Sequence, residues 1–135
     1  MAAAHPPAPD SLALVRALWD ATRDRDIDTG MTLMHPDVEW VPLLAEGPSI
    51  RGTEALRARL EEVAGSGILA ESYPLSFELL DDGRVLVVGA LRVRRPDHWM
   101  TTVQHWWVYV IRDGLIRRAQ ACESREAAIA SPIGT

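Results

Sequence analysis

The stretch that decides the fold is Val103-Gln104-His105-Trp106-Trp107-Val108-Tyr109-Val110, in the C-terminal third of the chain. It is rich in aromatic and β-branched residues, which is typical of a strand. Successive side chains of a strand point to opposite faces, so Val103, His105, Trp107 and Tyr109 share one face. Both faces carry large apolar side chains, whereas a strand solvated on one side alternates apolar and polar residues. We therefore expect both faces to be buried.

This strand, predicted over residues 101–111, lies within a run of similar segments. Strand-like patterns also cover residues 75–80, 84–93 and 115–121. Short segments rich in Asp, Gly and Pro separate them, at residues 81–83, 95–97 and 112–114. Consecutive strands joined by short turns pair in an antiparallel way. The second half of the chain therefore predicts a four-stranded meander.

Helical spacing characterises the first half. Apolar residues recur three and four positions apart in three segments, which predict helices that end near residues 23, 34 and 64. Residues 38–41 predict a strand between the second helix and the third. A short terminal helix begins at Ser124 and runs through Ala128. Helices followed by a meander indicate an α+β domain, with a curved mixed or antiparallel sheet packed on three N-terminal helices. We expect a disordered tail over residues 1–10, one domain over 11–130 and a short tail over 131–135.

Three helices cover only one face of such a sheet. The other face, which includes Trp106 and Val108, needs a different cover, because exposed apolar patches usually mark interfaces. A second copy of the chain is the simplest candidate, so the sequence predicts a homodimer through this face.

Composition excludes several classes of function. The formal charge of −5 argues against binding to nucleic acid. All fourteen basic residues are arginine, which excludes a Schiff-base lysine and a phosphate-loop lysine, and we expect no cofactor.

Cys122 is the only cysteine, so a reducing cytoplasm is the expected location. No apolar run reaches the roughly twenty residues that span a bilayer. His35 and Asp37 lack a third ligand at suitable spacing, so no metal site is expected.

Five segments together resemble the SnoaL-like and ketosteroid-isomerase-like family of the nuclear-transport-factor-2-like superfamily. They are Asp-Ile-Asp at 26–28, His-Pro-Asp-Val-Glu-Trp at 35–40, Ile-Arg-Gly-Thr-Glu-Ala-Leu at 50–56, Val-Ile-Arg-Asp-Gly-Leu-Ile at 110–116 and Glu-Ser-Arg-Glu-Ala-Ala at 123–128. The resemblance implies a cone-shaped barrel in which helices close the mouth of a bent sheet around an apolar cavity. Family members include cyclases, isomerases, dehydratases and epoxide hydrolases.

The catalytic residues of the family are not present in this chain. The general-base aspartate of the isomerase aligns with Pro42, its oxyanion-hole tyrosine with Leu18, and its oxyanion-hole acid with Trp107. The acid of the polyketide cyclases also aligns with Trp107. None of these three side chains transfers a proton, so the known mechanisms are not inherited.

Three other residues are candidates for acid–base chemistry. His105 shares the predicted inward face, and histidine is the residue type best suited to transfer protons near neutral pH. Glu123 aligns with a pocket tryptophan of the isomerase and is a candidate second acid, and Tyr109 is a candidate hydrogen-bond donor to a carbonyl oxygen. The structural alternatives are that His105 packs in the wall, Glu123 caps the terminal helix and Tyr109 belongs to the core.

The predicted ligand is a small, mostly apolar cyclic compound, with Trp19, Trp40, Trp107 and Val103 as pocket walls. The sequence is compatible with three functions. The first is a homodimeric pocket protein acting as a cofactor-free isomerase, cyclase or dehydratase. The second is a binding protein without catalysis. The third is a dimeric interaction module in which the aromatic side chains fill the cone and leave no cavity.

Overall fold

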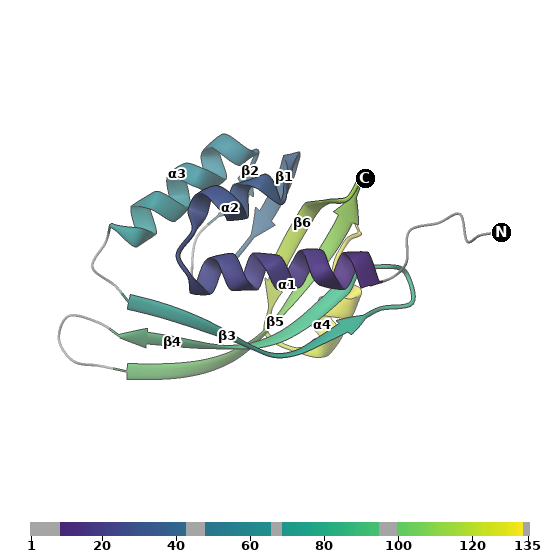
Figure 1. The fold of residues 1–135 in the computed structure, drawn as a ribbon. Helices are drawn as coiled ribbons and strands as arrows, with labels where there is room; N and C mark the ends of the chain where they lie inside the picture. The colour runs from purple at the N-terminus through teal and green to yellow at the C-terminus, as the bar shows by residue number, and fades with distance from the viewer. Residues whose placement is uncertain (1–8, 43–47, 66–68, 95–99, 134–135) are drawn as a thin grey trace.

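The computed structural model describes residues 9–42, 48–65, 69–94 and 100–133, and the predicted α+β order is confirmed (Figure 1). The helices are α1 (Pro9–Arg23), α2 (Ile27–Thr32), α3 (Thr53–Ala64) and α4 (Arg125–Ala130). The strands are β1 (Met34–Val41), β2 (Ile50–Arg51), β3 (Leu69–Leu79), β4 (Val85–Arg94), β5 (Met100–Arg112) and β6 (Leu115–Cys122). No described helix is long and apolar enough to cross a membrane.

The strands form one mixed sheet in the order β2-β1-β6-β5-β4-β3. The antiparallel meander from β3 to β6 is confirmed. Register shifts between Pro74 and Ser76 and between Val110 and Ile111 interrupt the pairing. Bulges of this kind bend and twist strands, and the sheet is curved and open (Figure 1).

Long-range pairing extends the sheet beyond the meander. Strand β1 lies parallel to β6, with Met34 opposite Ile116 and Trp40 opposite Ala119. The sequence predicts that the second helix continues to Met34 and that a turn follows, and this is wrong because pairing with β6 draws these residues into a strand. Parallel neighbours are far apart in the chain, so no local pattern indicates them.

Two of the predicted turns are confirmed. At the tip of the β5–β6 hairpin, Asp113 and Gly114 both have positive φ angles, 56° and 75°. Two consecutive residues in this region make the tight turn that matches the twist of a hairpin, and Asp-Gly is a preferred pair for it. At the β3–β4 turn the amide of Leu80 donates to the carbonyl of Arg84. The third predicted turn, at 95–97, lies outside the described residues.

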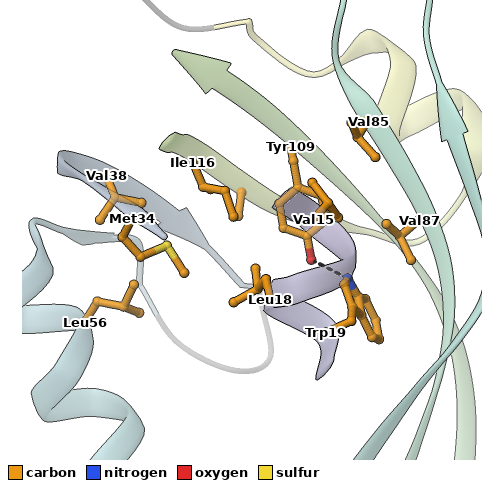
Figure 2. Close-up of a cluster of buried hydrophobic side chains, with 11 residues drawn as sticks. Val15, Leu18, Trp19, Met34, Val38, Leu56, Val85, Val87, Tyr109 and Ile116 are labelled. Atoms are coloured by element: carbon orange, nitrogen blue, oxygen red, sulfur yellow. Dashed lines mark hydrogen bonds between the residues drawn. The ribbon is translucent and has the colours of Figure 1, made fainter. Parts of the chain in front are cut away.

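The main core lies between α1 and the concave face of the sheet. Val15, Leu18 and Trp19 of α1 meet Val87 of β4 and Tyr109 of β5 (Figure 2). Helix α1 therefore presents one apolar face to the sheet, as its spacing predicts. The odd-numbered face of β5 points into this core, because His105 is 4% exposed and Tyr109 2%.

Helix α4 packs on the opposite face of the sheet. Its Ala128 forms a second apolar cluster with Leu86, Val108 and Cys122. Val108 is consequently only 1% exposed in the single chain. The prediction that Val108 lies in a dimer interface is wrong, because the terminal helix folds back over this part of the sheet. Trp106 is partly buried beside the same cluster.

A buried arginine holds α4 in place. The guanidinium of Arg84, which is 6% exposed, donates to the carbonyl oxygens of Ala128, Ile129 and Ser131 at the end of the helix. Its Nε also donates to Asp82, at 2.7 Å. The last carbonyls of a helix lack amide partners within it, so they are available to accept these hydrogen bonds from Arg84.

Candidate functional site

An open cavity of about 210 Å³ lies beneath the three N-terminal helices. Helices α1, α2 and α3 and strand β1 contribute its lining. Ten of the lining residues are apolar: Leu18, Ala21, Ile27, Gly30, Met31, Met34, Trp40, Leu60, Val63 and Ala64. Leu18, Ala21, Gly30 and Met34 are buried, whereas Val63 and Ala64 are exposed. The interior is therefore apolar, and the mouth opens beside the C-terminal end of α3.

Three polar residues also belong to the described lining, and all three are exposed: Thr22, Arg25 and Asp26. They belong to the end of α1 and the turn that leads into α2, so they form the opposite side of the mouth. The hydroxyl of Thr22 donates to the carbonyl of Leu18 at 2.9 Å. The cavity thus combines an apolar interior with a polar rim, which is typical of small-molecule sites.

Asp26 is fixed by its role as the N-cap of α2. One carboxylate oxygen accepts from the amide of Thr29 at 3.1 Å, and the other accepts from the Thr29 hydroxyl at 2.5 Å. These hydrogen bonds lower the pKa of the Asp26 carboxyl. A carboxylate whose oxygens are engaged in this way is a weak proton acceptor, so the geometry of Asp26 is that of a helix cap.

A row of aromatic rings runs from the cavity into the core. Trp40, in the cavity wall, packs on Trp107 with ring centroids 5.1 Å apart. Trp107 in turn stacks on Tyr109 at 6.1 Å and meets the edge of His105 at 6.0 Å. These separations are those of favourable aromatic contacts. The predicted residues of β5 therefore lie behind Trp40, and the cavity lining does not include them.

Tyr109, at the far end of this row, makes a hydrogen bond within the core. Its hydroxyl accepts a hydrogen bond from the indole Nε1 of Trp19 at 3.0 Å, across ninety positions of sequence (Figure 2). Burial raises the pKa of the Tyr109 hydroxyl, because the ionised form would lose its hydration. The ring of Trp19 lies directly over Gly89, where a Cβ atom would stand only 2.8 Å from its Cη2. This geometry matches the structural alternative for Tyr109.

A family model for the SnoaL-like domain matches residues 15–119, which is most of the chain. The protein belongs to the SnoaL-like domain family. No functionally curated protein matches its sequence.

Solved structures with the same fold include both ligand complexes and an enzyme. TerC, crystallised with polyporic acid, is 26% identical, with 87% of this chain and 94% of TerC covered and a TM-score of 0.75. Rv0760c from Mycobacterium tuberculosis, in complex with estradiol-17β-hemisuccinate, is 16% identical, with 87% and 95% covered and a TM-score of 0.71. An LEH-like epoxide hydrolase from M. tuberculosis is 17% identical, with 86% and 84% covered and a TM-score of 0.72.

The structure places two of the residues that the resemblance aligns with catalytic positions of the family. Leu18 lines the cavity. Trp107 lies behind the cavity wall and packs against Trp40. Both side chains lack an acid or a hydroxyl group.

The predicted site residues are therefore only partly brought together. Trp40 lines the cavity, and Trp107, Trp19 and Tyr109 form the aromatic row behind it, whereas Val103 is 43% exposed. His105 is buried and Glu123 is exposed, and neither lines the cavity. Ser124, and not Glu123, caps α4, since its side chain accepts from the amide of Ala127.

Most residues of the cavity lining are not recognisable as such from the sequence. Ile27, Met31, Met34, Leu60 and Val63 come from helices or their ends, where apolar residues at helical spacing indicate core. Core and cavity wall require the same residue types, so spacing alone does not separate them. The only available signal was the family alignment, which points to Leu18.

Proposed function

We propose that this SnoaL-like protein binds a small, mostly apolar cyclic compound in the cavity beneath α1, α2 and α3. The observation that supports the proposal is the lining itself, in which ten of the described residues are apolar and the described polar ones lie at the rim. Burial of apolar ligand surface supplies most of the binding free energy in such a site. The ligands held by TerC and Rv0760c suggest ring systems as probes.

Binding without turnover is favoured over catalysis. Among the described residues that line the cavity, the titratable side chains are those of Arg25 and Asp26. Arginine stays protonated and the Asp26 carboxylate is occupied by Thr29, so neither transfers protons readily. His105, Glu123 and Tyr109 remain candidates for acid–base chemistry only if the ligand reaches beyond the cavity wall. The presence of a cavity argues against an interaction module with a filled cone.

The test is ligand binding to the whole protein with estradiol, estradiol-17β-hemisuccinate and polyporic acid as probes. Ligand at a hundredfold excess over its Kd stabilises the native state by about 2.7 kcal/mol. For a chain of this length that corresponds to a rise in Tm of roughly 9 °C. Chromatography of the same mixtures measures turnover. Release of a product would contradict binding without catalysis, and no rise in Tm with any probe would contradict the proposal.

A matched pair of substitutions locates the bound probe. Ala64 and Ala58 are both exposed residues of α3, but only Ala64 lines the cavity. Ala64→Trp places a large ring at the mouth and should weaken binding at least about tenfold, which is about 1.4 kcal/mol. Ala58→Trp should leave the Kd unchanged. Equal affinities in the two variants would place the ligand elsewhere.

We also propose that the protein forms a homodimer through the part of the outer sheet face that α4 leaves uncovered. Trp106 pairs with Val88, and Gln104 pairs with Ala90, on this part of the face. Trp106, Val88 and Ala90 are all partly exposed. Trp106→Glu should convert a dimer to a monomer in analytical ultracentrifugation. A wild-type protein that sediments as a monomer at high concentration would contradict this part of the proposal.

A further inference from the structure

The turn between α1 and α2 has an unusual residue at its centre. Arg25 has a φ angle of +57°. The amide of Arg25 donates to the carbonyl of Thr22, and the amide of Asp26 donates to the carbonyl of Ala21. These two bonds define the Schellman motif that ends many helices, with Arg25 at the position where glycine is preferred.

An arginine at this position is unfavourable for the backbone. The left-handed region brings Cβ close to the backbone carbonyl, so residues other than glycine, asparagine and aspartate seldom occupy it. Residues held in such conformations are concentrated at functional sites. The turn itself does not favour arginine at this position, so a function of the Arg25 side chain would account for it. The place for such a function is the cavity mouth, which Arg25 lines.

Arg25 takes part in no ion pair within the described part of the protein. Nearby arginines on the same surface have carboxylate partners: Arg23 pairs with Asp20 and Asp24, and Arg57 pairs with Asp28. No described carboxylate pairs with Arg25. Asp26, the other charged residue of the rim, directs both of its oxygens to Thr29.

We propose that Arg25 binds an anionic group of the ligand, so that the cavity takes apolar ring compounds that carry a carboxylate or a comparable acidic group. This inference rests on the proposed binding function. The ring system would occupy the apolar interior, and its anion would lie at the mouth, where the guanidinium offers two parallel N–H donors. The hydroxyl of Thr22 already donates to Leu18, so among the described lining residues the guanidinium of Arg25 is the side-chain donor available to an anion.

Two related probes separate this inference from the proposed function. Estradiol-17β-hemisuccinate carries a carboxylate that estradiol lacks. The wild-type protein should bind the hemisuccinate about fivefold more tightly than estradiol, the upper end for an exposed ion pair. The preference should fall as salt is added. Arg25→Gln should abolish the preference, so that the ratio of the two Kd values falls to about one.

Arg23→Gln is the matched control. Like Arg25→Gln, it removes one positive charge near the C-terminal end of α1. Unlike Arg25, Arg23 does not line the cavity. It should retain the preference for the hemisuccinate. A further variant, Arg25→Gly, removes the guanidinium and relieves the backbone, so it should lose the preference while the Tm stays the same or rises.

The outcomes are distinct. Equal Kd values for the two steroids in the wild-type protein, or a preference that survives in Arg25→Gln, would overturn the inference and leave the proposed binding function intact. A preference lost equally in Arg23→Gln would also overturn it, because the effect would then come from net charge. If neither steroid nor polyporic acid binds, the proposed function itself fails.

Discussion

Replacing Tyr109 with phenylalanine tests whether this hydroxyl is structural. The substitution removes one oxygen atom from a residue that is 2% exposed and leaves the ring in place. Its partner, the indole N–H of Trp19, lies 3.0 Å away in a residue that is itself 6% exposed. The N–H would lose its acceptor, and water has little access to replace it.

The loss of stability that we expect from Tyr109→Phe follows from this geometry. A buried donor left unpaired costs about 1–3 kcal/mol. We expect Tyr109→Phe to lower the free energy of unfolding by about 2 kcal/mol, near the centre of that range. With an unfolding entropy of about 2.1 cal/mol/K per residue, the Tm should fall by roughly 7 °C.

The chain offers a matched control in its other tyrosine. The hydroxyl of Tyr73 donates to Glu71 at 2.8 Å and accepts from Arg92 at 3.2 Å, on the outer surface of the sheet. Water can replace these contacts, so Tyr73→Phe should change stability by less than about 0.5 kcal/mol. Urea unfolding followed by circular dichroism measures both variants.

Equal stabilities for the two variants would refute the argument, because the buried bond would then contribute no more than the exposed ones. Ligand binding provides a second readout. Since Tyr109 does not line the cavity, its substitution should leave the Kd of estradiol within about twofold of the wild-type value, which is about 0.4 kcal/mol. A much larger loss of affinity would instead support the role of Tyr109 as a donor to the ligand.

Two further predictions concern the same part of the core. Gly89→Ala should destabilise the protein by about 1–3 kcal/mol, because its Cβ would meet the ring of Trp19 at 2.8 Å; the cost should shrink in a Trp19→Phe background, and an equal cost in both backgrounds would contradict the clash. Burial raises the pKa of Tyr109, so above about pH 10 the unfolded chain releases a proton that the native hydroxyl keeps, and stability falls as pH rises. In Tyr73→Phe, absorbance at about 295 nm from tyrosinate should therefore appear only as the circular dichroism of the fold is lost, and its appearance in the folded protein would contradict the assigned burial.

Some features of the fold could be predicted from local patterns because interactions between residues close together in the sequence determine them. Alternation along β5 predicts that His105 and Tyr109 share a buried face, since side chains of a strand point alternately to its two sides. Asp113 and Gly114 predict the hairpin because few residue pairs tolerate two positive φ angles. Ser124 predicts the start of α4 because its side chain can accept from a free amide.

The candidate site could not be predicted in the same way. Met31 and Leu60 have the spacing of ordinary core residues, yet both face the cavity. Whether apolar faces of several helices close on one another or leave a hollow depends on the distances between those helices. Sequence spacing contains no information on these distances. The placement of α4 over Val108 is a similar case, because a six-residue helix has two faces of the sheet on which to dock.

The sequence by itself determined the α+β order, the two hairpin turns at 81–83 and 112–114, the inward face of β5 and the family resemblance, because each depends on residues close together in the chain. The tertiary structure alone decided the parallel pairing of β1 with β6, the bond between Trp19 and Tyr109, and the position of Arg25 at a cavity mouth. These features join segments distant in sequence. Their geometry depends on how the curved sheet and the helices pack together, which no single segment specifies.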